Sequence, residues 1–124
     1  MKLKLSQQPA FTLVEIMIVV AIIGLLAAIA IPNFVRARTT AQQNACINNL
    51  RQIDSAKQQW GLETRQLTNA VPLDSDVAPY LRSSSLTNVL CPSGGPTATF
   101  DSSYTLNSLS QAPTCNILTT HVLR

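Results

Sequence analysis

The chain begins with a short segment, residues 1–10, which carries Lys2 and Lys4 but no acidic side chain. From Phe11 to Ile31 the sequence is then almost continuously apolar, and the one charged side chain in this stretch is that of Glu15. A helix over the stretch would be about 30 Å long, which matches the hydrocarbon thickness of a bilayer. The pattern therefore predicts a helix over residues 11–32 that can span a membrane.

After the apolar run the pattern changes to that of an amphipathic helix, over residues 33–62. Gly24 interrupts the apolar part, and Pro32 is expected to stop or kink the helix there. The simplest interpretation is one very long helix from Phe11 to about Leu62, whose second half supports a small domain. One apolar face of that half consists of Cys46, Leu50, Ile53 and Trp60, with the stem of Lys57 among them.

Residues 63–124 have weaker helix signals and form the predicted head of an α+β fold. Asp74–Leu81 has the pattern of a short helix with an Asp or Ser cap and with Pro79 in its first turn. Ser103–Leu109 and Thr114–Leu123 have the alternating, β-branched character of strands. We expect a small antiparallel meander that packs on the apolar face of the long helix.

Three cysteines, Cys46, Cys91 and Cys115, are widely separated and form no CxxC pair. This spacing predicts neither a zinc site nor thioredoxin-like chemistry. Because Cys91 and Cys115 follow a membrane segment, we expect them to form a disulfide outside the cytoplasm. Cys46 lies on the core-facing side of the long helix and is interpreted as a small buried hydrophobe. A bond from Cys46 to either of the others remains an alternative.

Charge and motifs argue against nucleic-acid binding and catalysis. The formal net charge of +3 falls to almost neutral from Phe11 onward, and no basic tract marks a nucleic-acid surface. Arg36 and Arg38 follow the apolar run, where a solvated position at lipid headgroups is favoured over DNA capture. His121, in the last strand-like segment, belongs to no catalytic motif. We predict no enzyme activity, no cofactor and no metal.

A basic leader followed by an apolar run has three interpretations: an ordinary secretory signal, an uncleaved membrane anchor or a specialised export signal. Ala28-Ile29-Ala30 is an A-x-A site, so an ordinary secretory signal cleaved after Ala30 would release a soluble domain. Against this, the apolar stretch is longer than the usual signal core and is interrupted by Glu15.

The residues A-FTLVEIMIVVAIIGLLAAIAIPNF resemble the N-terminus of type IV pilins and of the pseudopilins of type II secretion systems. The shared elements are a short basic leader, the Phe-Thr-Leu-x-Glu start, and an apolar helix with a glycine near its middle and a proline at its end. The similarity covers about residues 8–35. This sequence departs from the family at Ala10, where the family usually has glycine.

The resemblance implies a type IV pilin-like α+β fold and a structural role. A prepilin peptidase would cut between Ala10 and Phe11 and methylate the new amine of Phe11. The helix would remain as an anchor in the bacterial inner membrane, with the head outside the cytoplasm. Copies of the chain or related pilins would polymerise into a pilus or a secretion pseudopilus, driven by an assembly ATPase and an inner-membrane platform.

The resemblance also gives Glu15 a role. Cleavage creates a cationic amine four residues earlier, on the same face of a helix, and the glutamate of related pilins is thought to pair with the amine of a neighbouring subunit and set axial register. A simpler interpretation is that Glu15 caps the helix. Gly24 and Pro32 would allow the segment between them to stretch in a filament. The alternative function is a secreted or membrane-anchored binding module with an ordinary signal.

Overall fold

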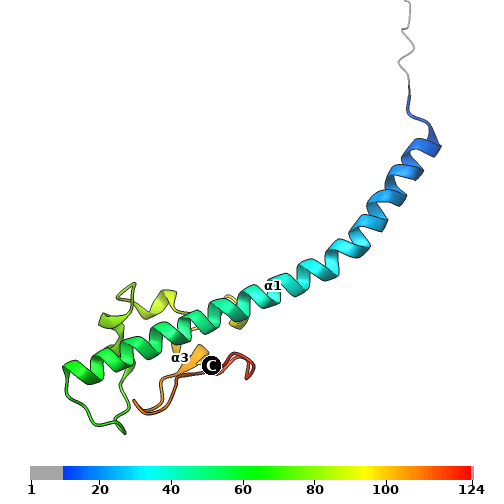
Figure 1. Cartoon of the computed structure of the whole chain (residues 1–124). Coiled ribbons are helices and arrows are strands. Elements are labelled where there is room, and N and C mark those ends of the chain that lie inside the picture. The colour runs from blue at the N-terminus through cyan, green and yellow to red at the C-terminus, as the bar shows by residue number, and fades with distance from the viewer. Residues whose placement is uncertain (1–9, 124) are drawn as a thin grey trace, which may run out of the picture. The chain divides into compact units, whose positions relative to one another are not determined.

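A computed structural model describes residues 10–123, so nine residues of the predicted leader lie outside the described part of the chain. Its internal contacts divide the chain into two units, of which the first ends at Ala37 and the second begins at Arg38 (Figure 1). Each unit is described by itself below.

Helix α1 (Leu13–Glu63) contributes residues to both units, and it confirms the predicted single long helix. It begins two residues later than predicted, and it does not stop at Pro32, which lies inside it. A proline at this position has no N–H for the carbonyl four residues earlier, so one hydrogen bond of the helix is missing there. In the first unit, a methyl group added at Gly24 would meet no atom within 4 Å.

The core of the second unit forms on the predicted apolar face of α1. Cys46, Leu50 and Ile53 are completely buried there, and Trp60 is nearly so. The rest of the head supplies side chains that pack against this face and close the core, namely Val77, Leu81, Val89, Cys91, Phe100, Tyr104, Leu106 and Cys115. Burial of these side chains provides the main favourable free energy for folding the head.

Short helical turns make up most of the head: α2 (Asp74–Val77), η1 (Ala78–Tyr80), η2 (Leu86–Asn88), η3 (Pro92–Gly94) and α3 (Phe100–Ser103). The first two confirm the short helix predicted at Asp74–Leu81. Its cap differs from the prediction, because the N-cap residue is Leu73, whose backbone N–H donates to Asp76 Oδ2 over 3.0 Å.

The sheet contains two short antiparallel strands, β1 (Tyr104–Thr105) and β2 (Thr114–Cys115). Tyr104 pairs with Cys115, and Thr105 pairs with Thr114. These two strands of two residues each form a smaller sheet than the predicted meander. Asn107 has φ 57°, in the left-handed region, so the extended backbone cannot continue beyond it. At the other strand, a turn closed by His121 N–H and the Leu118 carbonyl replaces the predicted extension.

The completely buried Lys57 joins α1 to the segment between the strands. Its Nζ donates to the carbonyl oxygens of Leu106, Ser108 and Gln111, over 2.6, 2.9 and 2.7 Å. All three donors of the ammonium group are therefore used. Burial lowers the pKa of Lys57, and the charge of Asp54 opposes this shift.

Candidate functional site

The predicted cleavage site lies just before α1. Ala10 and Phe11 belong to no helix or strand, and the Phe11 side chain is 83% exposed. A peptidase needs an accessible bond in non-helical backbone, and the bond between these two residues meets both requirements. The sequence predicted that Phe11 and Glu15 lie on the same helical face. In the structure they do not, because α1 begins at Leu13, after Phe11.

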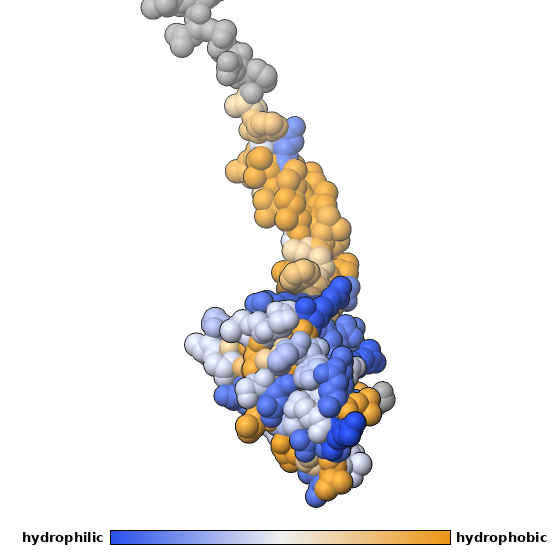
Figure 2. Space-filling model, turned by 90° about the vertical axis from the view of Figure 1, so that its left-hand side faces the viewer, coloured by the Kyte–Doolittle hydropathy of each residue, from blue (hydrophilic) through white to orange (hydrophobic). Residues whose placement is uncertain are grey.

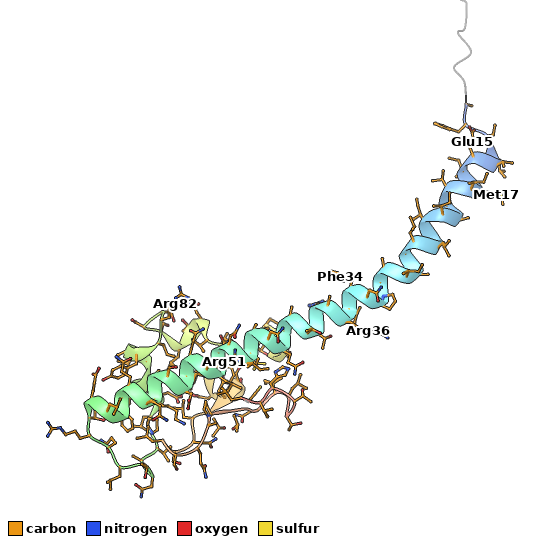
Figure 3. The ribbon with its side chains drawn as sticks, viewed as in Figure 1. Glu15, Met17, Phe34, Arg36, Arg51 and Arg82 are labelled. Atoms are coloured by element: carbon orange, nitrogen blue, oxygen red, sulfur yellow. The ribbon has the colours of Figure 1, made fainter. Side chains whose placement is uncertain are left out.

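Thr12 and Glu15 form a capping box at the start of α1. The Thr12 backbone N–H and hydroxyl donate to Glu15 Oε2 over 2.8 and 2.7 Å, and the Glu15 N–H donates to Thr12 Oγ1 over 3.2 Å. Figure 3 shows Glu15 at this end of the helix. The interaction expected of a capping glutamate is thus present.

The first unit exposes an apolar surface on all sides of α1. Its large hydrophobic side chains, from Phe11 to Val35, are each more than half exposed. Figure 2 shows them gathered on this unit, whereas hydrophilic residues cover most of the visible face of the second unit. The helix is long and apolar enough to cross a membrane, and none of its most apolar window is buried. A surface of this kind requires lipid or other apolar helices around it.

A second cluster of side chains lies inside the head. Cys46 on α1, Cys91 just before η3, Cys115 on β2 and His121 in the C-terminal turn are all buried, and their Sγ and Nδ1 atoms lie within 4.8 Å of one another. Cys91 Sγ is 3.8 Å from Cys115 Sγ, and His121 Nδ1 is 3.7 and 3.9 Å from these two sulfurs.

This arrangement includes every cysteine and the one histidine of the chain. The cysteines are free thiols in the structure, so the pairing of Cys91 with Cys115 remains a prediction. Cys46 is buried as expected, but beside sulfur and nitrogen atoms as well as apolar groups. Spacing gave little signal for the cluster: Cys115 and His121 are six residues apart, but Cys46 and Cys91 come from distant segments.

Tyr104 and Asn49 form a polar layer behind the cluster. Asn49 Nδ2 donates to Tyr104 Oη over 3.0 Å and also to the Leu90 carbonyl over 2.9 Å. Tyr104 in turn is hydrogen-bonded to Cys46. Burial raises the pKa of the Cys46 thiol, an effect that the hydrogen bond with Tyr104 opposes. Burial also raises the pKa of Tyr104.

Comparison with known proteins identifies the N-terminal motif. A family described as "Prokaryotic N-terminal methylation motif" matches residues 5–31. The type IV major pilin protein PilA of Myxococcus xanthus (strain DK1622) is 53% identical over 47 residues, which are 38% of this chain and 21% of that protein. Over its N-terminal part the chain is thus similar to type IV pilins and pseudopilins. Its long N-terminal helix and small antiparallel sheet fit the α+β fold of these pilins.

Similarity to pilins and pseudopilins extends beyond the motif. The type IV major fimbrial protein FimA of Dichelobacter nodosus is 37% identical over 97 residues, which are 78% of this chain and 54% of that protein. The type II secretion system core protein G of Vibrio cholerae is 32% identical over 60 residues, or 48% of this chain and 41% of that protein. The chain therefore spans between about a fifth and about half of the length of these relatives. No solved structure matched.

Proposed function

We propose that this pilin-like chain is a structural subunit of a type IV pilus or of a type II secretion-type pseudopilus. The observation that carries the proposal is the N-terminal motif. It joins an exposed Ala10–Phe11 bond, a capped Glu15 and a helix whose apolar side chains are exposed on every side. The similarity to major pilins and to a secretion core protein supports the same function.

In this proposal a prepilin peptidase removes residues 1–10 and methylates the amine of Phe11. Residues 11–32 then anchor the subunit in the bacterial inner membrane, with residues 63–124 outside the cytoplasm. The basic residues Lys2 and Lys4 would keep the leader on the cytoplasmic side. Polymerisation exchanges lipid around the apolar helix for the helices of other copies or related pilins. An assembly ATPase and an inner-membrane platform would drive this exchange.

Glu15 is the residue that we propose sets axial register. One of its carboxylate oxygens accepts both hydrogen bonds from Thr12, which leaves the other available for the amine of a neighbouring subunit. Charges attract more strongly in a low-dielectric bundle than in water, so the pair would favour one axial position over others. Gly24 and Pro32 would let the helix between them lengthen, because one weakens helix propensity and the other removes a hydrogen bond.

The mass of the mature N-terminus tests the processing step. We expect intact-mass and N-terminal fragment spectra to give a chain that begins with N-methylated Phe11. Ala10→Gly should be processed at least as well, since it restores the usual family residue, whereas a bulky Ala10→Leu should retain the leader. A mature chain that begins at Ile31, after the Ala28-Ile29-Ala30 site, would refute the proposal and indicate a secreted domain.

A further inference from the structure

We propose that Cys46, Cys91, Cys115 and His121 form a site for a single Zn²⁺ ion in the head. The four ligand atoms face one another at short range inside the protein, and each comes from a different segment. Three thiolates and one imidazole are a usual ligand set for a structural zinc ion. The site is separate from the N-terminal motif, so its test and that of the filament function are independent.

The distances fit tetrahedral coordination. With Zn–S near 2.3 Å and Zn–N near 2.0–2.1 Å, a tetrahedral site places two sulfurs about 3.8 Å apart and a sulfur about 3.6 Å from a nitrogen. The Cys91–Cys115 sulfur separation is 3.8 Å, and the two sulfur–nitrogen separations are 3.7 and 3.9 Å. The Cys46 sulfur lies within 4.8 Å of the other three atoms. One ion at the centre would require the Cys46 sulfur to approach the other ligand atoms by up to about 1 Å.

The surroundings of His121 point to a ligand role independently of these distances. The residue is 2% exposed, and within the described residues its Nδ1 has only the Cys91 and Cys115 sulfurs as hydrogen-bond partners. Thiols are weak donors and weak acceptors, so they satisfy a buried imidazole nitrogen poorly. A metal ion bound to Nδ1 would satisfy it well.

Tyr104 would support the ligands of the ion without binding the ion itself. Its hydroxyl oxygen accepts from Asn49, so its own proton is available to a neighbouring acceptor, and its interaction with Cys46 lowers the pKa of that thiol. Hydrogen bonds of this kind orient metal ligands and stabilise the negative charge of thiolates.

Binding converts three thiols to thiolates, so three protons are released per ion while His121 binds as neutral imidazole. No electrons are transferred, and the bound site has a net charge of −1. Because four protein ligands leave no open position, the ion is structural. It would tie α1 to the Cys91 segment, β2 and the C-terminal turn, in a head too small to have a large core.

Metal content of the full-length chain tests the proposal. The protein is purified in detergent without chelators, and metals are quantified by mass spectrometry. We expect a zinc-to-chain ratio near about 1. Cys46→Ser and His121→Asn should each lower zinc affinity by about 100-fold or more. Thr119→Ala, an exposed change two residues from His121, serves as the matched control and should keep the wild-type ratio.

Thiol state distinguishes zinc from the predicted disulfide. If zinc is bound, all three cysteines of the wild-type chain should be alkylated after denaturation and chelation without reductant. A Cys91–Cys115 disulfide would leave only Cys46 reactive, and that result with substoichiometric zinc would overturn the proposal. Stoichiometric iron or copper in place of zinc would also overturn it. Both measurements use the wild-type chain, so they do not depend on whether a variant folds.

Cobalt(II) gives a spectroscopic check of geometry. Wild-type protein stripped of metal and titrated with Co²⁺ should develop thiolate-to-cobalt charge transfer and the intense visible bands of tetrahedral cobalt. The weak bands of octahedral cobalt, without charge transfer, would contradict a Cys₃His site.

Discussion

At the scale of single residues, Lys57 is the head's most costly buried group. A completely buried ammonium group is tolerated because its three N–H groups each donate a hydrogen bond to a backbone carbonyl. These carbonyls belong to the segment between β1 and β2, which lacks regular structure for most of its length. Lys57 therefore supplies from α1 the donors that this segment would otherwise obtain from a sheet.

We expect Lys57→Met to reduce the free energy of unfolding of the head by about 3 kcal/mol, because it leaves three carbonyls without their charged donor. Denaturant unfolding of the full chain in detergent, followed by the fluorescence of Trp60, measures this change. Gln58→Met is the matched control. Gln58 donates to the Leu109 carbonyl in the same segment but is exposed, so its loss should cost about 1 kcal/mol or less. Equal losses for the two variants would contradict this role for Lys57.

At the scale of elements, two short helices bring carboxylates together. Asp74 is the first residue of α2, and Asp101 lies in the first turn of α3. Each position favours an acidic residue because helix N-termini carry partial positive charge. The two side chains nevertheless meet at one groove, lined also by Leu73, Tyr104 and Asn107. Burial, together with the hydrogen bond and the charge of Asp101, raises the pKa of Asp74 to about 6.

This shift predicts a pH dependence of stability. The folded head holds a proton on Asp74 that the unfolded chain releases near its ordinary pKa of 3.8, so stability from this group falls as pH rises from about 4 to above 6. Asp74→Asn and Asp101→Asn should each flatten the fall, because either change removes the repulsion between the carboxylates. Thermal unfolding at pH values from 4 to 8 is the measurement. Variants whose profiles run parallel to wild type would rule out this coupling.

At the scale of the whole molecule, the N-terminal helix and the head have opposite surface chemistry. Apolar side chains cover the first unit, and polar residues cover most of the visible face of the second (Figure 2). Glu15 is the exception in the first unit, and its capping box with Thr12 explains how an isolated chain accommodates it. Capping alone does not require a carboxylate in an apolar helix, because the neutral glutamine can serve at the same position of a capping box.

A comparison of two substitutions separates the cap from the proposed register role. Thr12→Ala removes the cap and should weaken the start of the helix by about 0.5–2 kcal/mol, yet it keeps the carboxylate. Glu15→Ala removes both functions. We expect both variants to insert and to lose the leader normally, while only Glu15→Ala strongly reduces incorporation into filaments. The readout is the amount of subunit in sheared filaments relative to the membrane fraction. If the two variants entered filaments to a similar extent, the register role of Glu15 would be wrong and only its capping role would remain.

Part of the candidate site could be predicted from the sequence. The apolar helix and Glu15 near its start follow one another along the chain, so predicting them needs no tertiary contact. The leader and the cleavage bond stay predictions of the same local kind. The apolar face of α1 was also predictable, because a helix places Cys46, Leu50 and Ile53 on one side through a local periodicity. The capping box needed only the spacing of Thr12 and Glu15.

Other features depended on contacts between distant segments. The strands are shorter than β propensity predicts, since Asn107 adopts a left-handed conformation and a turn precedes His121. The same turn brings His121 back to Cys115, six residues earlier, and the tertiary fold adds Cys46 and Cys91, which no local spacing connects to them. Sequence alone determined the long apolar helix, because that depends on contiguous apolar residues. Only the tertiary structure decided which groups meet inside the head, because each contact there closes a loop whose ends no local pattern specifies.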